Sequence, residues 1–144
     1  MRIYLDNCCF NRPFDSQAQV RVRLETEAKL RIQERVVAGE VELAWSYILD
    51  YENAANPFEE RRAAVRLWRA RSVVDVIETP GILDRAKSLI RLGVHSKDAL
   101  HVASAVEAGC EYFVTTDDGL LKKLSEYTEV SVVDPTAFVR ATEP

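Results

Sequence analysis

Short apolar segments alternate with longer amphipathic segments along the whole chain of 144 residues. The apolar segments have the length and the β-branched or aromatic content of strands. They are Met1–Leu5, Val41–Trp45, Val73–Ile77, Tyr112–Thr115 and Val130–Val133. Strands that alternate with helices predict a mostly parallel sheet, because each parallel connection needs a crossover. We therefore expect an α/β fold with three α/β/α layers and a single domain over residues 1–144.

The segments between the strands carry helix signals. Apolar residues at four-residue spacing predict one buried face on a long helix from about Gln19 to Val37. That face comprises Leu24, Ala28, Ile32 and Val36. The other expected helices are Ser46–Asn56, Phe58–Arg71, one that starts at Thr79-Pro80, Ser96–Gly109 and Gly119–Tyr127, with a helical turn around Phe138. Pro13 predicts that residues 11–15 form a loop.

Composition narrows the class of protein. A hydrophobic content of 47% is that of a globular chain, and a net charge of −4 argues against a general polyanion binder. Cys8, Cys9 and Cys110 are odd in number and lack zinc-ligand spacing, so we expect reduced, mostly buried thiols in a cytoplasmic protein. We expect no signal peptide and no membrane span, since no apolar segment approaches ~20 residues.

Four acids occupy comparable positions along the chain. Asp6 ends the first apolar segment, and Asp117 directly follows the fourth. Glu52 lies in the helix after the second segment, and Asp98 lies in the first turn of the helix that opens at Ser96. Ligand sites of open α/β sheets form outside the carboxyl ends of the strands, so these acids are expected to meet at one edge. Carboxylates in such proximity repel one another, which predicts a hard divalent cation between them.

Each acid also has an ordinary explanation. Asp98 could simply complement a helix N-terminus, Asp117 could be a turn residue, and Glu52 could be a solvated helix residue. Asp6 is harder to explain in this way, because an unpaired acid at the end of a buried strand is costly. The joint placement of the four is what favours a common site.

Four runs of the sequence resemble the motifs of PIN domains, in order and over nearly the whole chain. They are Ile3–Asn7, Ser46–Glu52, Lys97–Ala105 and Phe113–Asp117. The resemblance implies a Rossmann-like fold and an endoribonuclease that hydrolyses RNA phosphodiester bonds with Mg²⁺ or Mn²⁺. By motif position it implies that the catalytic and metal-binding residues are Asp6, Glu52, Asp98 and Asp117. Many small members are VapC-like toxins of prokaryotic type II toxin–antitoxin systems, which implies an RNA substrate, a protein antitoxin and a homodimer.

Neighbours of the acids are candidates for supporting roles. Asn7 stands where the family usually has Thr or Ser, and its amide can still hydrogen-bond a carboxylate. Ser46 and Thr115 match the hydroxyl residues of the second and last motifs, and Ser46 also fits a helix cap. Asp118 could bind water near the metal or simply start the following helix. For His101, three residues after Asp98, a packing or surface role is favoured over contact with substrate.

Basic residues could hold the phosphates of an RNA. Arg62, Arg66 and Arg69 align at helical spacing, although pairing with nearby glutamates on a solvated face is the more ordinary role. Arg12 is another possible RNA contact, near the first motif, as is Arg21.

Two other classes of function were weighed. A haloacid-phosphatase-like phosphotransfer protein needs a second Asp two residues after the first, and Cys8 stands there. No glycine-rich phosphate loop follows Leu5, which argues against a nucleotide-binding domain. A catalytically inactive module that binds RNA or protein on the same fold remains open.

Overall fold

The computed structural model describes all 144 residues and contains one sheet of five parallel strands. The strands are β1 (Arg2–Leu5), β2 (Glu42–Ser46), β3 (Val74–Val76), β4 (Tyr112–Val114) and β5 (Ser131–Val133). Their order across the sheet is β3-β2-β1-β4-β5. All four pairs of neighbours are parallel, as in Tyr4 opposite Ala44 and Phe113. The predicted α/β class is confirmed, and the sheet is parallel throughout.

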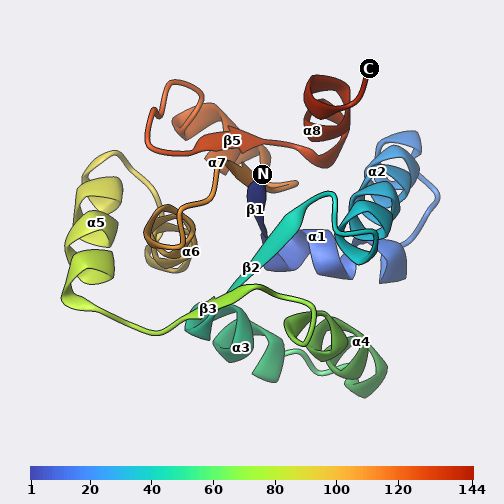
Figure 1. The fold of residues 1–144 in the computed structure, drawn as a ribbon, viewed down its shortest axis with the longest axis horizontal. Coiled ribbons are helices and arrows are strands. Elements are labelled where there is room, and N and C mark those ends of the chain that lie inside the picture. The colour runs from blue at the N-terminus through green and yellow to red at the C-terminus, as the bar shows by residue number, and fades with distance from the viewer.

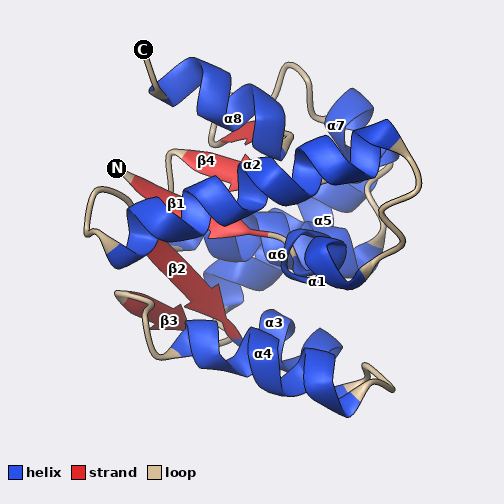
Figure 2. Cartoon of the chain, turned by 90° about the vertical axis from the view of Figure 1, so that its right-hand side faces the viewer, coloured by secondary structure: helices blue, strands red, loops and turns tan.

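Helices cover both faces of this sheet (Figures 1 and 2). They are α1 (Asn7–Asn11), the short 3₁₀ helix η1 (Arg12–Phe14), α2 (Val20–Val37), α3 (Tyr47–Ala54), α4 (Glu59–Arg69), α5 (Pro80–Arg91), α6 (Ser96–Glu107), α7 (Asp118–Lys123) and α8 (Pro135–Thr142). In Figure 1, α5 and α6 lie on one side of the sheet and α2 and α8 on the other. None of the helices has both the length and the apolar character that crossing a membrane requires.

The helix boundaries follow the local signals in the sequence. Ser46 caps α3 by accepting from the backbone N–H of Leu49, and Thr79 caps α5 just before Pro80. Gly39 lies beyond the end of α2 with a φ of 77°, a conformation that glycine adopts without a Cβ clash. These starts and stops agree with the predicted ones.

The segment after Asp6 differs from the prediction. Residues 7–11 form the helix α1, which the sequence pattern did not indicate, and residues 12–14 form η1 where a loop was expected. Asp6 caps α1 by accepting from the backbone N–H of Asn7. Pro13 lies in the first turn of η1, where a missing N–H costs no helical hydrogen bond. This compact connection fixes the position of Asp6 at the end of β1.

The buried face of α2 also differs from the prediction. Leu24 is 53% exposed, whereas Glu25 and Lys29 are buried together with Ile32 and Val36. Glu25 can be buried because its carboxylate pairs with arginine side chains from its own helix and from η1. The face that enters the core is therefore rotated from the purely apolar one, toward two charged residues.

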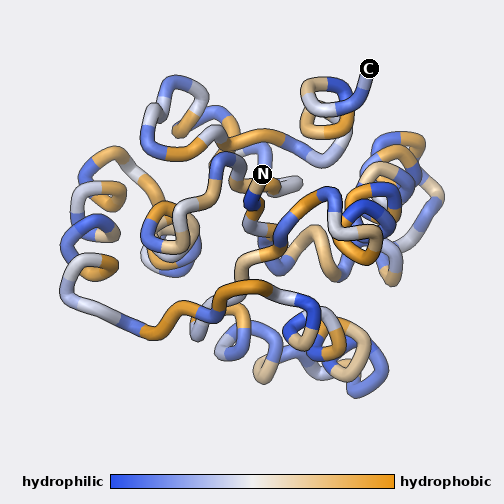
Figure 3. Tube along the Cα trace, viewed as in Figure 1, coloured by the Kyte–Doolittle hydropathy of each residue, from blue (hydrophilic) through white to orange (hydrophobic).

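The core follows the central strands. The β1 residues Ile3, Tyr4 and Leu5 are fully buried, because helices cover both faces of this strand. The Tyr4 ring stacks on Phe113 of β4 with centroids 5.3 Å apart. The outer strands β3 and β5 each carry one polar residue between or before valines, Asp75 and Ser131. In Figure 3 the helices alternate between hydrophobic and hydrophilic residues. The sheet is thus a rigid support for whatever lies at its carboxyl edge.

Candidate functional site

Asp6 lies at the end of β1, the strand on both sides of which the sheet is extended. The strands run from β1 to β2 and β3 on one side, and β4 and β5 follow on the other side of β1. The crevice between β1 and β4 is therefore the switch point at which α/β folds bind ligands. The backbone N–H of Asp6 donates to the Val114 carbonyl oxygen at 2.9 Å, which ties the two strand ends together.

The Asp6 carboxylate is almost fully buried and held on both oxygens. The residue is 5% exposed, and its Oδ1 accepts from the backbone N–H of Asn7 at 2.8 Å. Its Oδ2 accepts from the Thr115 hydroxyl at 2.8 Å. These bonds offset part of the desolvation cost of a buried carboxylate and fix its orientation.

Thr115 connects Asp6 to Asp117. The Thr115 Oγ1 that donates to Asp6 also accepts from the backbone N–H of Asp117 at 3.1 Å. The Asp117 carboxylate caps α7 by accepting from the backbone N–H of Leu120 at 3.2 Å, and the residue is exposed. Thr115 therefore hydrogen-bonds both to the Asp6 carboxylate and to the backbone of Asp117.

The pKa of Asp98 is shifted by burial and by the charges at this edge of the sheet. It lies in the first turn of α6, and its pKa is raised to about 6 by burial and by the negative charges of Asp6 and Asp117, with a smaller contribution from Glu52. The nearby His101 acts in the opposite sense. Asp6, Asp117 and Glu52 therefore lie near enough to Asp98 for their charges to raise its pKa.

Glu52 is held by a buried chain of hydrogen bonds. Its Oε1 lies 2.6 Å from His101 Nε2, and His101 Nδ1 lies 2.6 Å from the Tyr4 hydroxyl. The Tyr4 hydroxyl in turn lies 2.5 Å from Ser46 Oγ. His101, Tyr4 and Ser46 are fully buried. This chain of hydrogen bonds connects β1, β2, α3 and α6.

The direction of these bonds follows from what each group can donate. An ionised Glu52 only accepts, so His101 Nε2 carries a hydrogen. In its neutral form His101 accepts at Nδ1 from the Tyr4 hydroxyl, which accepts in turn from Ser46. Ser46 Oγ also accepts from the backbone N–H of Leu49, so in that form every member of the chain has a partner.

The same contacts shift the pKa values of Glu52 and His101. Burial alone would raise the pKa of Glu52, but the hydrogen bond and charge of His101 lower it overall. Burial would lower the pKa of His101, but the hydrogen bond to Glu52 and the charge of Asp6 raise it overall. Glu52 is thereby kept ionised, and its carboxylate is pinned on one oxygen.

Cys8 contacts the site, whereas Asp118 is paired with Arg21. Cys8 Sγ lies 3.5 Å from both Asp6 Oδ2 and Thr115 Oγ1, while Cys9 and Cys110 are buried, and none of the three forms a disulfide. Asp118 is 72% exposed and points to Arg21, whose Nη1 and Nη2 donate to its two oxygens at 2.6 and 2.7 Å. The pair lowers the pKa of Asp118.

The arginines that are predicted to contact phosphates differ in whether they already have partners within the protein. Arg12 pairs with Asp15 and Glu25. On α4, Arg62 donates to the Asn56 carbonyl oxygen, and Arg69 pairs with Asp50 and Asp75. Arg66 is exposed and has no partner within the chain. Contact of these residues with RNA stays a prediction.

The donor set suits a hard, partly hydrated cation. No three His, Cys, Asp or Glu side chains are arranged to enclose an ion directly. Mg²⁺ keeps several waters and takes one or two carboxylates, so it does not need such an enclosure. The pKa of Asp98 is raised first by burial and then by the negative charges of Asp6 and Asp117. A divalent cation would neutralise that charge.

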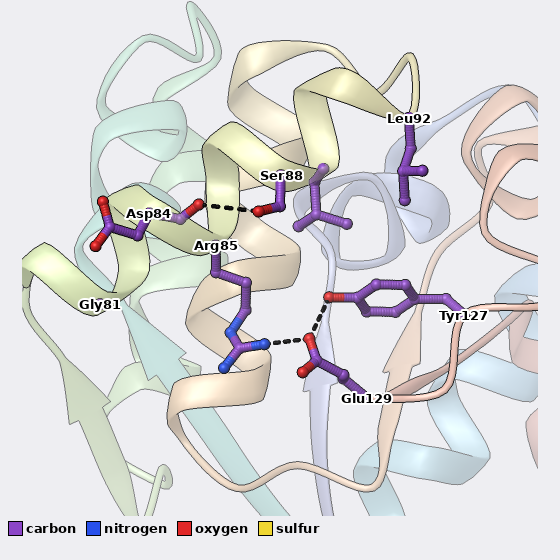
Figure 4. A pocket seen from close by; sticks show the side chains of 8 residues that line it. Gly81, Asp84, Arg85, Ser88, Leu92, Tyr127 and Glu129 are labelled. Carbon is purple, nitrogen blue, oxygen red and sulfur yellow. Dashed lines mark hydrogen bonds and ion pairs between the residues drawn. The ribbon is translucent and has the colours of Figure 1, made fainter.

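One pocket away from the acids has no part in this arrangement. It measures about 360 Å³ and lies between α5 and the segment before β5 (Figure 4). Its one cation, Arg85, already pairs with Glu129, which also accepts from the Tyr127 hydroxyl. None of the four acids lines it.

Tyr4 is a part of the site that the sequence pattern did not indicate. His101 was expected to pack or to lie at the surface, and it is fully buried, but its bond to Glu52 was not foreseen. One signal was available: a tyrosine in a buried strand needs a partner for its hydroxyl.

Comparison with known proteins gives the family and the fold. The sequence matches the model of the PIN domain over residues 3–127. No curated protein matches it. Among solved structures, VapBC-1 from nontypeable Haemophilus influenzae superposes with a TM-score of 0.60 at 16% identity, covering 94% of this chain and 99% of that one.

Two DNA-bound complexes are also similar. VapBC from Salmonella typhimurium has a TM-score of 0.57 at 18% identity, with 94% of this chain and 98% of that one covered. VapBC2 from Rickettsia felis, bound to a DNA fragment from its promoter, has a TM-score of 0.57 at 12% identity, with coverage of 92% and 97%. At these identities the likeness bears on the fold alone.

Proposed function

The chain belongs to the PIN domain family, and from this membership we propose that it is a metal-dependent endoribonuclease that hydrolyses RNA phosphodiester bonds. The observation that supports the proposal is the position of Asp98, where burial and the negative charges of Asp6, Asp117 and Glu52 raise its pKa. We propose that residues 1–144 act as one PIN-like domain, with Asp6, Glu52, Asp98 and Asp117 as the catalytic acids.

The cofactor in this proposal is Mg²⁺ or Mn²⁺. Asp6, Asp98 and Asp117 would hold the ion, and Glu52 would bind it through water or position the attacking water. Such an ion, when bound, lowers the pKa of water and stabilises the charge that develops on the phosphate.

The protein's own contribution is orientation. Thr115 and the backbone N–H of Asn7 hold the Asp6 carboxylate in one direction before any ligand arrives. His101 holds one oxygen of Glu52 and so fixes the direction of its carboxylate. Fixed side chains of this kind lower the cost of reorganisation during the reaction.

We propose further that the protein is the toxin of a type II toxin–antitoxin pair and acts in the cytoplasm as a homodimer. The similar solved structures are VapBC complexes, and this chain spans nearly their whole length. A protein antitoxin is then the natural partner.

The activity is tested with purified protein, a labelled RNA and Mg²⁺ or Mn²⁺. Asp6→Asn should abolish cleavage while the circular dichroism spectrum stays unchanged, because the amide keeps the shape and removes the charge. Asp84→Asn, at an exposed position of α5, is the matched control and should cleave like wild type. Equal cleavage by wild type and Asp6→Asn would refute the assignment. RNA binding without turnover in either metal would point to an inactive binding module.

The toxin role is tested separately in cells. Expression of the wild-type chain should arrest growth, and co-expression of the neighbouring gene product should reverse the arrest. Normal growth with abundant folded protein would contradict the toxin role and leave the nuclease proposal standing.

A further inference from the structure

Lys29 is a buried cation without a counter-charge. The residue is 4% exposed and has no hydrogen bond or ion pair within the protein, and its Nζ keeps only a small contact with solvent at the cavity that it lines. Glu25, one helical turn earlier, would be its natural partner, but Glu25 Oε1 is taken by Arg12 at 3.0 Å and Arg21 at 3.4 Å. An unpaired charge away from water is costly, so the position calls for an explanation.

The surroundings of Lys29 are largely apolar. Its Nζ lies 5.8 Å from the centroid of the Phe10 ring, a weak substitute for an anion. Burial lowers the pKa of Lys29 to about 8. The ammonium is therefore still largely charged near neutral pH and poorly solvated.

Lys29 lines a cavity of about 200 Å³ between η1, α2 and α4. Phe10, Phe14 and Trp68 contribute apolar walls. Gln33, one turn after Lys29, lines the same cavity, and its Nε2 is buried without a hydrogen-bond partner. Two unpaired donors thus lie on one face of α2 beside an aromatic pocket.

We propose that this pocket binds a small apolar carboxylate, whose oxygens accept from Lys29 Nζ and Gln33 Nε2 and whose aryl or alkyl body packs against Phe10, Phe14 and Trp68. Both polar groups are donors, so the ligand must present acceptors. A single cation matches a monoanion, whereas a doubly charged phosphate would bring an uncompensated charge into an apolar pocket. The cavity is below the usual range of drug-sized sites, which restricts the ligand to a small molecule.

The pocket in Figure 4 gives a useful contrast. Its cation, Arg85, is already neutralised by Glu129 within the chain. The Lys29 pocket, by contrast, combines apolar walls with a buried cation that has no anionic partner. None of the four acids lines the Lys29 pocket, so this proposal goes beyond the proposed nuclease and does not depend on it.

The test measures binding of 3-phenylpropanoate by ligand-observed NMR and titration calorimetry, with 3-phenylpropanamide as the neutral analogue. Wild type should bind the carboxylate at least about tenfold more tightly than the amide, the size of a charge-assisted hydrogen bond. Lys29→Met, which keeps the length and apolar character of the side chain, should lose this preference. Lys87→Met, at an exposed position of α5, is the control and should behave like wild type.

Urea unfolding shows whether the variants are still folded, so that a loss of binding can be told from a loss of structure. Lys29→Met should be at least as stable as wild type, because it removes an unpaired buried charge. Gln33→Leu is a second variant and should weaken the carboxylate while retaining the amide. The proposal is overturned if wild type fails to bind the carboxylate at millimolar concentration. It is also overturned if amide and carboxylate bind equally, or if a folded Lys29→Met keeps the preference.

Discussion

Replacing Asp98 by Asn removes one negative charge from the crowded edge of the sheet and keeps the shape of the side chain. The pKa of Asp98 is raised from 3.8 to about 6, a difference of about 2 units. At about 1.4 kcal/mol per unit, this corresponds to at most about 3 kcal/mol of strain in the ionised form. Solvent around the partly exposed side chain reduces the expected effect to about 1–2 kcal/mol.

The sign follows from linkage. Because the pKa is higher in the folded state, the contribution of Asp98 to stability is fully present below its ordinary pKa and is lost as the pH rises through about 6. Asp98→Asn should therefore stabilise the metal-free protein at about pH 7.5, raising its melting temperature by about 3–8 °C for a domain of this size. The difference from wild type should shrink toward zero near pH 4.

Thermal unfolding followed by circular dichroism, in EDTA at the two pH values, measures this effect. Asp84→Asn removes an exposed charge from α5 and should change little at either pH. Added Mg²⁺ should raise the melting temperature of wild type more than that of Asp98→Asn. If Asp98→Asn is no more stable than wild type at neutral pH, or differs from it equally at both pH values, the acids do not crowd one another.

Three further results are expected. Tyr4→Phe leaves Ser46 Oγ and His101 Nδ1 with an incomplete buried chain and should cost about 1–3 kcal/mol in urea unfolding, where an unchanged midpoint would contradict the chain. The affinity for Mn²⁺, measured by electron paramagnetic resonance, should be weaker at about pH 5 than at about pH 7.5, because Asp98 is protonated below about 6 in the metal-free protein. An affinity that does not change with pH would exclude Asp98 as a ligand. Thr79→Ala removes the cap of α5 and should lower stability by about 1 kcal/mol, a loss that Thr79→Ser should largely restore.

The positions of the strands and of the acids beside them were predictable because they depend on local patterns. An apolar run that ends at Asp6 identifies both a buried strand and its carboxyl end, and the topology of parallel sheets then brings such ends to one edge. The caps at Ser46 and Thr79 were predictable for the same reason: each needs only a hydroxyl three residues before a backbone N–H.

The contacts that hold the acids in place were not predictable in this way. Tyr4 and His101 are 97 positions apart, and no local pattern pairs a strand tyrosine with a helix histidine. The predicted face of α2 was wrong because apolar spacing cannot show that arginines on two elements neutralise Glu25 inside the protein. Long-range pairing of polar groups therefore decided both features.

Diffraction from a crystal soaked in Mn²⁺, with anomalous scattering recorded, tests most directly whether the acids cooperate in holding a cation. The account predicts an anomalous peak within coordination reach of Asp6 and of Asp98 or Asp117, and no such peak in Asp98→Asn crystals soaked in the same way. A peak elsewhere, or none at this edge in wild type, would contradict it.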